Sequence, residues 1–206
     1  KRQEADFNES NSLFTEKFGE YFSDNPPSGS MADLGCGPGD ISIRMAVKYP
    51  GWQVTGLDAG ENMLKLAQRR LDAEQLGDRV RFQHSYLPDE SLPAASFDAI
   101  ISNSLLHHLP QPQVLWGSIA QLASPGAAIQ VMDLLRPQTE PEARRLVEIY
   151  AADAPDILKE DFYNSLLAAY TPQEVAAQLL VAGLDRLRIE IASDRHWIVH
   201  GRINGH

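Results

Sequence analysis

Cysteine is almost absent from the sequence, which contains one, Cys36, among 206 residues. A lone cysteine excludes an internal disulfide and a zinc site made of several thiolates, and it is typical of a reducing compartment. Long apolar runs are absent too, because glycine, proline or charge interrupts them before the roughly 20 residues that a membrane-spanning helix needs. The N-terminus lacks the apolar segment of a signal peptide. These absences predict a cytoplasmic protein, and a further segment can precede Lys1, which is not Met.

Basic residues are also few. The chain has 18 Lys and Arg against 28 Asp and Glu, a formal net charge of −10, and the basic residues are scattered. Proteins that bind nucleic acid usually present a basic stripe to the phosphates, so nucleic acid is a poor candidate partner. Hydrophobic residues make up 43% of the chain and charged residues 22%, which is typical of a globular protein. The length predicts a single domain over residues 1–206 and leaves the oligomeric state open.

Segments of strand type alternate with segments of helical period along most of the chain. Strands are predicted over residues 30–36, 53–57, 79–84, 97–103 and 127–134, and helices over 40–49, from 61 and across 114–122. In this pattern a connection crosses from each strand to the next, which builds a parallel sheet with helices on both faces. Pro125 and Gly126 are predicted to close the helix that precedes the fifth strand.

The C-terminal third ends differently. Thr171, Pro172 and Glu174 form a helix start with a capping box, and Gly183 is expected to end that helix. Strands over 187–191 and 197–203 follow, joined by a link too short for a crossover and therefore antiparallel. The predicted fold is α/β: a doubly wound, Rossmann-like sheet of seven strands, mostly parallel, with a C-terminal antiparallel hairpin. A helical cap over 1–27 and a helical insertion over 136–170 complete it.

A glycine-rich loop joins the first strand to the first helix after it. Gly35, Gly37 and Gly39 allow a sharp turn and a close approach of a ligand to the backbone. A nicotinamide fingerprint needs a further glycine where this sequence has Asp40. Asp33 beside the loop would repel a pyrophosphate but suits a ligand with cationic groups. S-adenosylmethionine is such a ligand, because it carries an ammonium and a sulfonium and no phosphate. The alternative interpretation of the loop is a strand-to-helix turn that binds no ligand.

Residues 31–39 (MADLGCGPG) resemble the glycine motif of class I, Rossmann-like methyltransferases that use S-adenosylmethionine, and residues 57–64 (LDAGENML) resemble their acidic loop. The resemblance extends over nearly the whole chain. It implies S-adenosylmethionine as the cofactor and S-adenosylhomocysteine as the product. The residues implied at the cofactor site are Asp33, Gly35, Cys36, Gly37, Gly39, Asp58, Ala59, Met63, Ser85, Tyr86 and Asn103.

Two of these positions need separate comment. Independently of the resemblance, Asp58 ends the second strand, where a carboxylate can accept hydrogen bonds from a ribose diol. By analogy with the family, Met63 would lie against the adenine, and it also suits the core of its helix. Many relatives carry an Asp after the third strand that accepts from the adenine amine, but this chain has Ser85 and Tyr86. Either residue can replace that contact, or both can belong to an ordinary loop.

The segment after the fourth strand lies where the methyl acceptor is expected. Asn103 is followed by Ser-Leu-Leu rather than by the Pro-Pro-aromatic motif of enzymes that methylate adenine bases or glutamine amides. The segment Leu106-His107-His108-Leu109 resembles that of small-molecule methyltransferases. His107 and His108 are candidate catalytic bases, or they shape the pocket. No metal site is predicted, because no carboxylate or cysteine joins them at ligand spacing.

The insertion over 136–170 should emerge at the carboxyl edge of the sheet, above the ligand. Its aromatic residues, with those of the N-terminal helix and the hairpin turn, are candidates for the acceptor pocket, or they serve only to pack these elements. Asp133 and Arg136 have the same ambiguity. The candidate acceptor-binding residues are Tyr21, His107, His108, Phe162, Tyr163 and Arg195.

The resemblance implies methyl transfer by in-line displacement to a small molecule. This chemistry depends mainly on positioning, and a base is needed only when the acceptor carries a proton that must leave. The main alternative is a protein that binds the cofactor without turnover. An NAD-dependent oxidoreductase is disfavoured by Asp40 and by the terminal hairpin. The sequence leaves O-, N- and C-methylation open.

Overall fold

The computed structural model describes the backbone of residues 2–203 and the side chains of residues 9–203. The strands are β1 (Gly29–Leu34), β2 (Trp52–Asp58), β3 (Val80–His84), β4 (Phe97–Asn103), β5 (Ala123–Leu134), β6 (Arg188–Ile191) and β7 (His196–Arg202). The helices are α1 (Arg2–Tyr21), α2 (Asp40–Lys48), α3 (Glu61–Glu74), the short η1 (Leu106–His108), α4 (Gln113–Leu122), α5 (Glu140–Tyr150), α6 (Asp156–Ala168) and α7 (Pro172–Val181).

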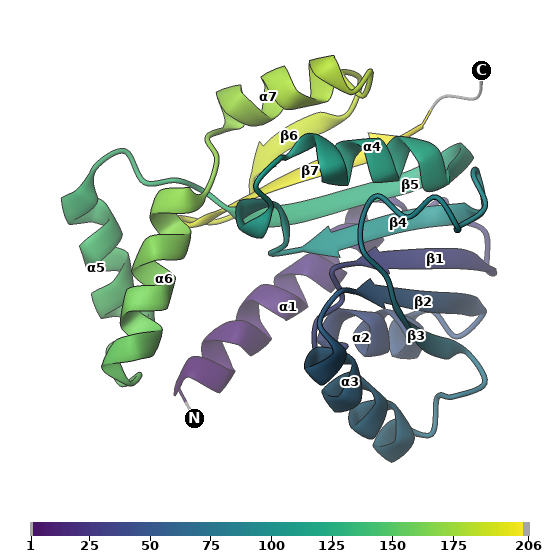
Figure 1. The fold of residues 1–206 in the computed structure, drawn as a ribbon, viewed down its shortest axis with the longest axis horizontal. Coiled ribbons are helices and arrows are strands. Elements are labelled where there is room, and N and C mark those ends of the chain that lie inside the picture. The colour runs from purple at the N-terminus through teal and green to yellow at the C-terminus, as the bar shows by residue number, and fades with distance from the viewer. Residues whose placement is uncertain (1, 204–206) are drawn as a thin grey trace.

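The seven strands form one sheet in the order β3-β2-β1-β4-β5-β7-β6 (Figure 1). β1 to β5 pair in parallel with one another, whereas β7 runs antiparallel to both β5 and β6. β4 lies near the middle, and its run Ala99-Ile100-Ile101 is fully buried, as expected of a strand covered on both faces. The predicted doubly wound sheet with a terminal hairpin is confirmed.

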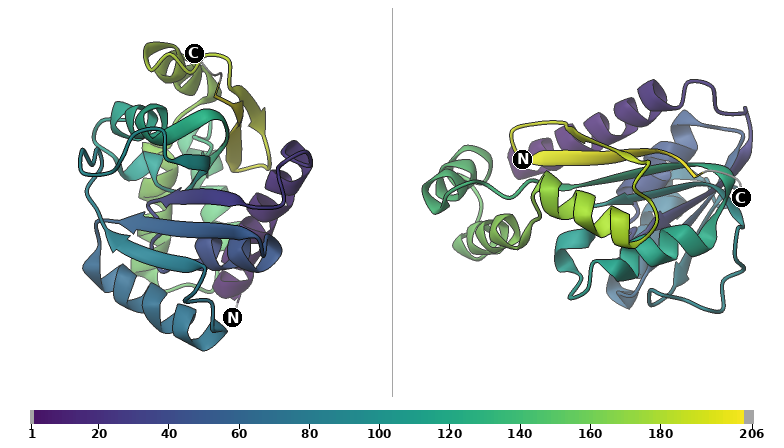
Figure 2. Two further views of the ribbon diagram at one scale, coloured as in Figure 1. Left: turned by 90° about the vertical axis from the view of Figure 1, so that its right-hand side faces the viewer. Right: turned by 90° about the horizontal axis from the view of Figure 1, so that it is seen from above.

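Helices cover the two faces of the sheet unequally. α1, α2 and α3 pack on one face, and α4 and α7 on the other (Figure 2). Each face has its own core. Phe14, Phe18 and Met45 belong to the first core, and Trp116 and Trp197 to the second. The two cores hold the strands in register and fix where the loops leave the sheet.

The predicted helix boundaries agree closely at α7. The Thr171 hydroxyl accepts from the Glu174 backbone N–H, and the Glu174 carboxylate accepts from the Thr171 N–H. Gly183 adopts φ 70° just after the helix. The boundary predicted between α4 and β5 was wrong. Pro125 and Gly126 were expected to close the helix before the fifth strand, but they lie inside β5, where the register against β4 shifts. Gly126 has φ 82° and donates its N–H to the Ile203 carbonyl, so the irregular start of β5 still pairs.

α5 and α6 lie beyond the carboxyl ends of the parallel strands (Figure 1). They form a third, separate core with the end of β5, built from Leu134, Leu146, Val147 and Leu166. α1 also reaches this edge with its N-terminal half. Of the helices in residues 2–203, none is long and apolar enough to cross a membrane.

Candidate active site

The glycine loop at the end of β1 has the conformation that its glycines predict. Gly35, Gly37 and Gly39 all have positive φ, at 71°, 52° and 81°. A Cβ on Gly39 would lie 2.6 Å from the Phe82 ring, so this glycine lets the loop pack on β3. A Cβ on Gly37 would meet nothing within 4 Å. The loop is therefore packed on one side and open on the other, which is the side available to a ligand.

Asp58 ties the end of β2 to this loop. Its carboxylate accepts from the Gly37 N–H at 2.8 Å and from the Gly60 N–H at 2.7 Å. Each carboxylate oxygen has a second lone pair that remains for a ligand. This arrangement fits the predicted contact with a ribose diol, because the accepting group is held rigidly at the carboxyl edge of the sheet.

Asp33 lies under the loop and is 1% exposed. The Ser42 hydroxyl at the start of α2 donates to it at 2.6 Å. Burial raises the pKa of Asp33 to about 7, against the opposing effect of the Ser42 hydrogen bond. Burial disfavours the charged form of Asp33, and a cation that binds near the loop would stabilise that form.

The predicted adenine region is more open. Ser85 is buried and donates its hydroxyl to Asp89 at 2.7 Å, whereas Tyr86 is 68% exposed and Met63 is 45% exposed. The Ala59 carbonyl lies 3.1 Å from His84 Nε2. Asp89 was missed by the sequence analysis, although a carboxylate four residues after Ser85 was a visible signal. It places an acid beside Ser85, one of the two residues expected to replace the contact made by the family's Asp.

Asn103 ends β4 next to the loop and has an unused acceptor. Its Nδ2 donates to Asn11 of α1 at 3.3 Å, while its Oδ1 is buried without a hydrogen-bond partner among the described residues. Ser104, which follows, has φ 59°, an uncommon conformation for a residue with a side chain. An orphaned buried oxygen is costly unless a ligand donates to it. Together with Asp33, Asp58 and the open side of Gly37, it fits a ligand that has an ammonium group and a ribose diol.

A cavity of about 260 Å³ adjoins Asn103 at this edge of the sheet, and we call it the edge cavity. Five segments line it: the N-terminal half of α1, the segment after β4, the end of β5, helices α5 and α6 with the turn between them, and the start of β7. A larger hollow of about 360 Å³ lies at the opposite end of the strands and contains none of the predicted site residues. The residues around the edge cavity are Ser10, Asn11, Asn103, Ser104, His107, His108, Leu134, Tyr150, Ala151, Leu158, Asp161, Phe162, Ser165, Arg195 and His196.

The two candidate bases differ in their surroundings. His107 Nδ1 lies 2.5 Å from Asp133 Oδ1, and the two side chains are 5% and 1% exposed. Asp133 also accepts from the backbone N–H groups of His107, at 3.3 Å, and Leu134, at 2.6 Å. The His108 ring stacks obliquely on that of His107, with 4.0 Å between centroids. Burial, with a smaller contribution from His107, lowers the pKa of His108.

The hairpin turn forms one wall of the cavity. The Arg195 guanidinium lies 3.4 Å from the centre of the Tyr150 ring and donates to Asp194 at 3.2 Å. The Tyr150 hydroxyl donates to the same carboxylate at 2.7 Å. Burial, together with the charge of Arg195, lowers the pKa of His196 to about 4, so this imidazole is neutral near pH 7. The wall is therefore held by paired side chains.

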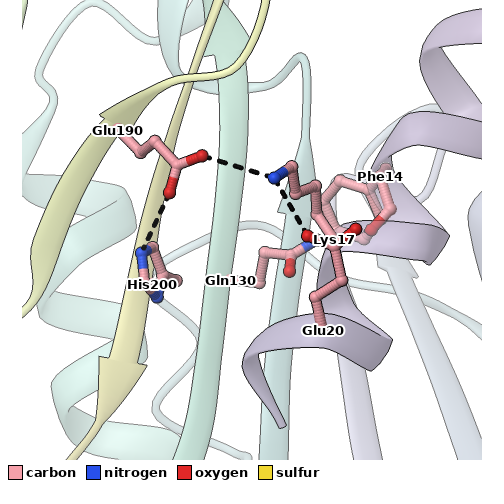
Figure 3. Close-up of polar contacts among 6 residues, drawn as sticks. All are labelled: Phe14, Lys17, Glu20, Gln130, Glu190 and His200. Atoms are coloured by element: carbon pink, nitrogen blue, oxygen red, sulfur yellow. Dashed lines mark hydrogen bonds and ion pairs between the residues drawn. The ribbon is translucent and has the colours of Figure 1, made fainter.

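The structure does not bring all the predicted acceptor residues to the cavity. Tyr21 stacks on His200 with 3.6 Å between ring centroids, beside the Lys17–Glu190–His200 chain that ties α1 to the hairpin (Figure 3). Tyr163 packs against Arg144 and donates its hydroxyl to a glutamate of the same helical pair. Of the predicted set, His107, His108, Phe162 and Arg195 line the cavity.

Several residues of the cavity wall were not predicted from the sequence, and Asp133, which contacts His107 without lining the cavity, was left ambiguous. Asn11 and Asp161 carry no motif that would select them. For Asp133 a signal existed: it ends the strand next to β4, and residues that follow neighbouring parallel strands lie close together.

The sequence comparison places this geometry in a family. A model of the methyltransferase domain matches residues 32–129, from β1 into β5. The strand order, the glycine loop, this match and the methyltransferases to which the chain is similar together support a class I methyltransferase dependent on S-adenosylmethionine. It is similar to an uncharacterized methyltransferase of Mycobacterium tuberculosis, 26% identical over 149 residues that cover 72% of this chain and 73% of that one. It is also 29% identical to a ubiquinone biosynthesis O-methyltransferase of Psychrobacter arcticus, over 82% of this chain and 65% of the relative.

Solved structures share the fold at lower identity. A SAM-dependent methyltransferase from Aquifex aeolicus superposes with a TM-score of 0.64 at 18% identity, over 90% of this chain and 89% of that one. The [4+2]-cyclase SpnF superposes with a TM-score of 0.61, also at 18% identity, over 93% of this chain and 81% of that one. The second likeness shows that the fold does not by itself fix the reaction.

Proposed function

We propose that this chain transfers the methyl group of S-adenosylmethionine to a small molecule held in the edge cavity. The observation that carries the proposal is the position of this cavity, which adjoins the orphaned Asn103 oxygen beside the glycine loop. A volume of about 260 Å³ is near the lower end of ordinary small-molecule pockets. The relatives include a 27-O-demethylrifamycin SV methyltransferase of Amycolatopsis mediterranei and a trans-aconitate 2-methyltransferase of Variovorax paradoxus, whose names refer to small molecules.

Different residues at the carboxyl edge contact different parts of the cofactor. Asp58 accepts from the ribose diol, and the open side of Gly37 lies against the ligand. Asp33 and Asn103 favour the ammonium group, Asp33 through its charge and Asn103 through its free oxygen. When bound, S-adenosylmethionine supplies a methyl group on a sulfonium, which leaves as a neutral thioether.

The cap and the insertion complete the cavity. α1 contributes Ser10 and Asn11, and the pair α5 and α6 contributes Tyr150, Leu158 and Phe162. We propose that this enclosure, built on residues 1–27 and 136–170 of a single domain, excludes water and holds the acceptor near the methyl group. Positioning of this kind supplies several kcal/mol toward a displacement reaction.

Isothermal titration tests the cofactor half of the proposal. We expect S-adenosylhomocysteine to bind with micromolar affinity and NADH not to bind. Asp58→Ala removes a charged acceptor and frees the loop, so affinity for S-adenosylhomocysteine should fall about 100-fold. Asp185→Ala, an exposed aspartate after α7, is the matched control and should bind normally. Binding of NADH in place of the adenosyl compound would overturn the proposal.

A screen with methyl-labelled S-adenosylmethionine and a metabolite library tests the transfer itself. The expected result is label in one small-molecule class, abolished by Asp58→Ala. Tight cofactor binding with no labelled product would favour the alternative, a protein that binds the cofactor without turnover.

A further inference from the structure

The contact between His107 and Asp133 determines which nitrogen of the imidazole carries the proton. The inference drawn from this contact rests on the proposed function. Asp133 is buried, and its oxygens accept from two backbone N–H groups as well as from the imidazole. Both oxygens of Asp133 accept from backbone N–H groups, so the carboxyl group acts as the acceptor in this geometry. With Asp133 as the acceptor, His107 Nδ1 is the donor in their contact, so the proton of the neutral ring resides on Nδ1. This leaves Nε2 with a free lone pair.

His107 is the imidazole in the cavity wall that a carboxylate holds in this way. The adjacent His108 has no such partner among its described contacts, and the ring nitrogen Nδ1 of His196 is already 2.9 Å from the Ser193 hydroxyl. The other charged groups around the cavity are Arg195, which is paired with Asp194, and Asp161. Position and pairing therefore single out His107 as the base.

We infer that Asp133 is a positioning residue that keeps His107 Nε2 ready to take a proton, and that the acceptor is a hydroxyl on an aromatic or conjugated ring. In this step, the His107 Nε2 lone pair takes the hydroxyl proton and the oxygen lone pair forms the new O–C bond. The S–C bond breaks and its electron pair stays on sulfur. The imidazolium then releases its proton to solvent.

The choice of hydroxyl follows from acidity and from the cavity walls. A phenol has a pKa of about 10, within reach of an imidazole base, whereas an aliphatic alcohol is much less acidic. A neutral amine attacks with its own lone pair and needs no base beforehand. Leu134, Leu158 and Phe162 give the cavity an apolar side suited to a flat ring.

The first test reads the tautomer directly and does not depend on turnover. In ¹⁵N NMR spectra of the cofactor-free protein at pH 8, we expect His107 to carry its proton on Nδ1. In Asp133→Asn the new amide donates to Nδ1, and the proton should move to Nε2. Asp185→Asn is the matched control and should leave the His107 signals unchanged. A wild-type His107 protonated on Nε2 would overturn the inference.

The second test uses the acceptor found in the labelling screen and its analogue in which an amine replaces the hydroxyl. Asp133→Asn should lower kcat for the hydroxyl compound about 100-fold or more. KM and affinity for S-adenosylhomocysteine should change less than about threefold, and methylation of the amine should be spared. His107→Gln should give a similar loss, and the double variant should lose little more. An acceptor methylated on a primary amine, or a full rate in Asp133→Asn, would overturn the inference.

The two proposals fail in different ways. A wild-type protein that does not bind S-adenosylhomocysteine contradicts the proposed function whatever the tautomer of His107. A protein that binds it and methylates an amine contradicts only the inference about Asp133.

Discussion

The two halves of the site are built by different means. The glycine loop and Asp58 come from one stretch of the chain, residues 33–60, and most of their contacts are made by backbone groups. The edge cavity takes side chains from five segments between Ser10 and His196. A backbone site requires particular residues at fixed spacing, so its sequence is constrained. A cavity requires only that the sum of its side chains has the right shape, and many sequences meet that condition.

The largest effect is expected at Gly39, where backbone and packing requirements coincide. Gly39→Ala places a Cβ 2.6 Å from the Phe82 ring at φ 81°. We expect a loss of about 3 kcal/mol in the free energy of unfolding, measured with urea. Gly37→Ala is the matched variant, because its Cβ meets nothing within 4 Å.

Gly37→Ala should therefore cost about 1 kcal/mol of stability, for its positive φ alone. It should nevertheless lower affinity for S-adenosylhomocysteine at least about tenfold, since the new methyl group occupies the open side of the loop. Equal destabilisation by the two variants would contradict the division of the loop into a packed side and an open side.

Asp33 provides the next test, because its folded-state pKa lies near 7 and above its ordinary value of 3.8. Below pH 4 the group is protonated in both folded and unfolded chains and has no effect. As pH rises from about 4 to 7, the unfolded chain loses the proton more readily, so wild-type stability falls, and the loss is constant above pH 7.

Asp33→Asn removes this penalty. We expect it to be more stable than wild type at pH 8 by about 2 kcal/mol, since each pKa unit corresponds to about 1.4 kcal/mol and burial of the amide offsets part of the gain. At pH 4 the gain is absent and only the cost of burying the amide remains, so the variant should be no more stable than wild type. The same variant should bind S-adenosylhomocysteine more weakly. A stability difference that is equal at both pH values in thermal unfolding would refute this account of Asp33.

The smallest effect is expected in the cavity, where the proposed contact with the acceptor is shared among several side chains. Phe162→Ala should raise KM for the acceptor about tenfold, which corresponds to about 1.4 kcal/mol of lost apolar contact, and leave cofactor affinity unchanged. Tyr163→Ala changes the neighbouring ring, which packs on Arg144 outside the cavity, and should leave KM unaltered. Similar KM values for the two variants would argue that α6 does not contact the acceptor.

The sequence was sufficient for the strands, for the capping box at Thr171 and for the C-terminal hairpin, because each depends on local periodicity or local hydrogen bonds. It misled at Pro125 and Gly126, where pairing with the neighbouring strand and with Ile203 outweighed local turn preference.

For the candidate site, spacing was enough to predict the turn of the glycine loop and the position of Asp58 at the end of β2. It could not show that Tyr21 faces His200, because the face that a helix presents depends on what packs against it. The same limit applies to the pairing of Asp133 with His107, which follows from strand order rather than from distance along the chain.

The separate core of α5 and α6 bears on how this protein can change over evolutionary time. These helices pack on each other and on the end of β5, whereas the glycine loop follows β1, on the other side of β4. Substitutions on the inner surface of this helical pair can alter which molecule is accepted without disturbing the sheet cores or the glycine loop. Selectivity and methyl-donor binding can thus diverge independently, and relatives that share the donor need not share an acceptor.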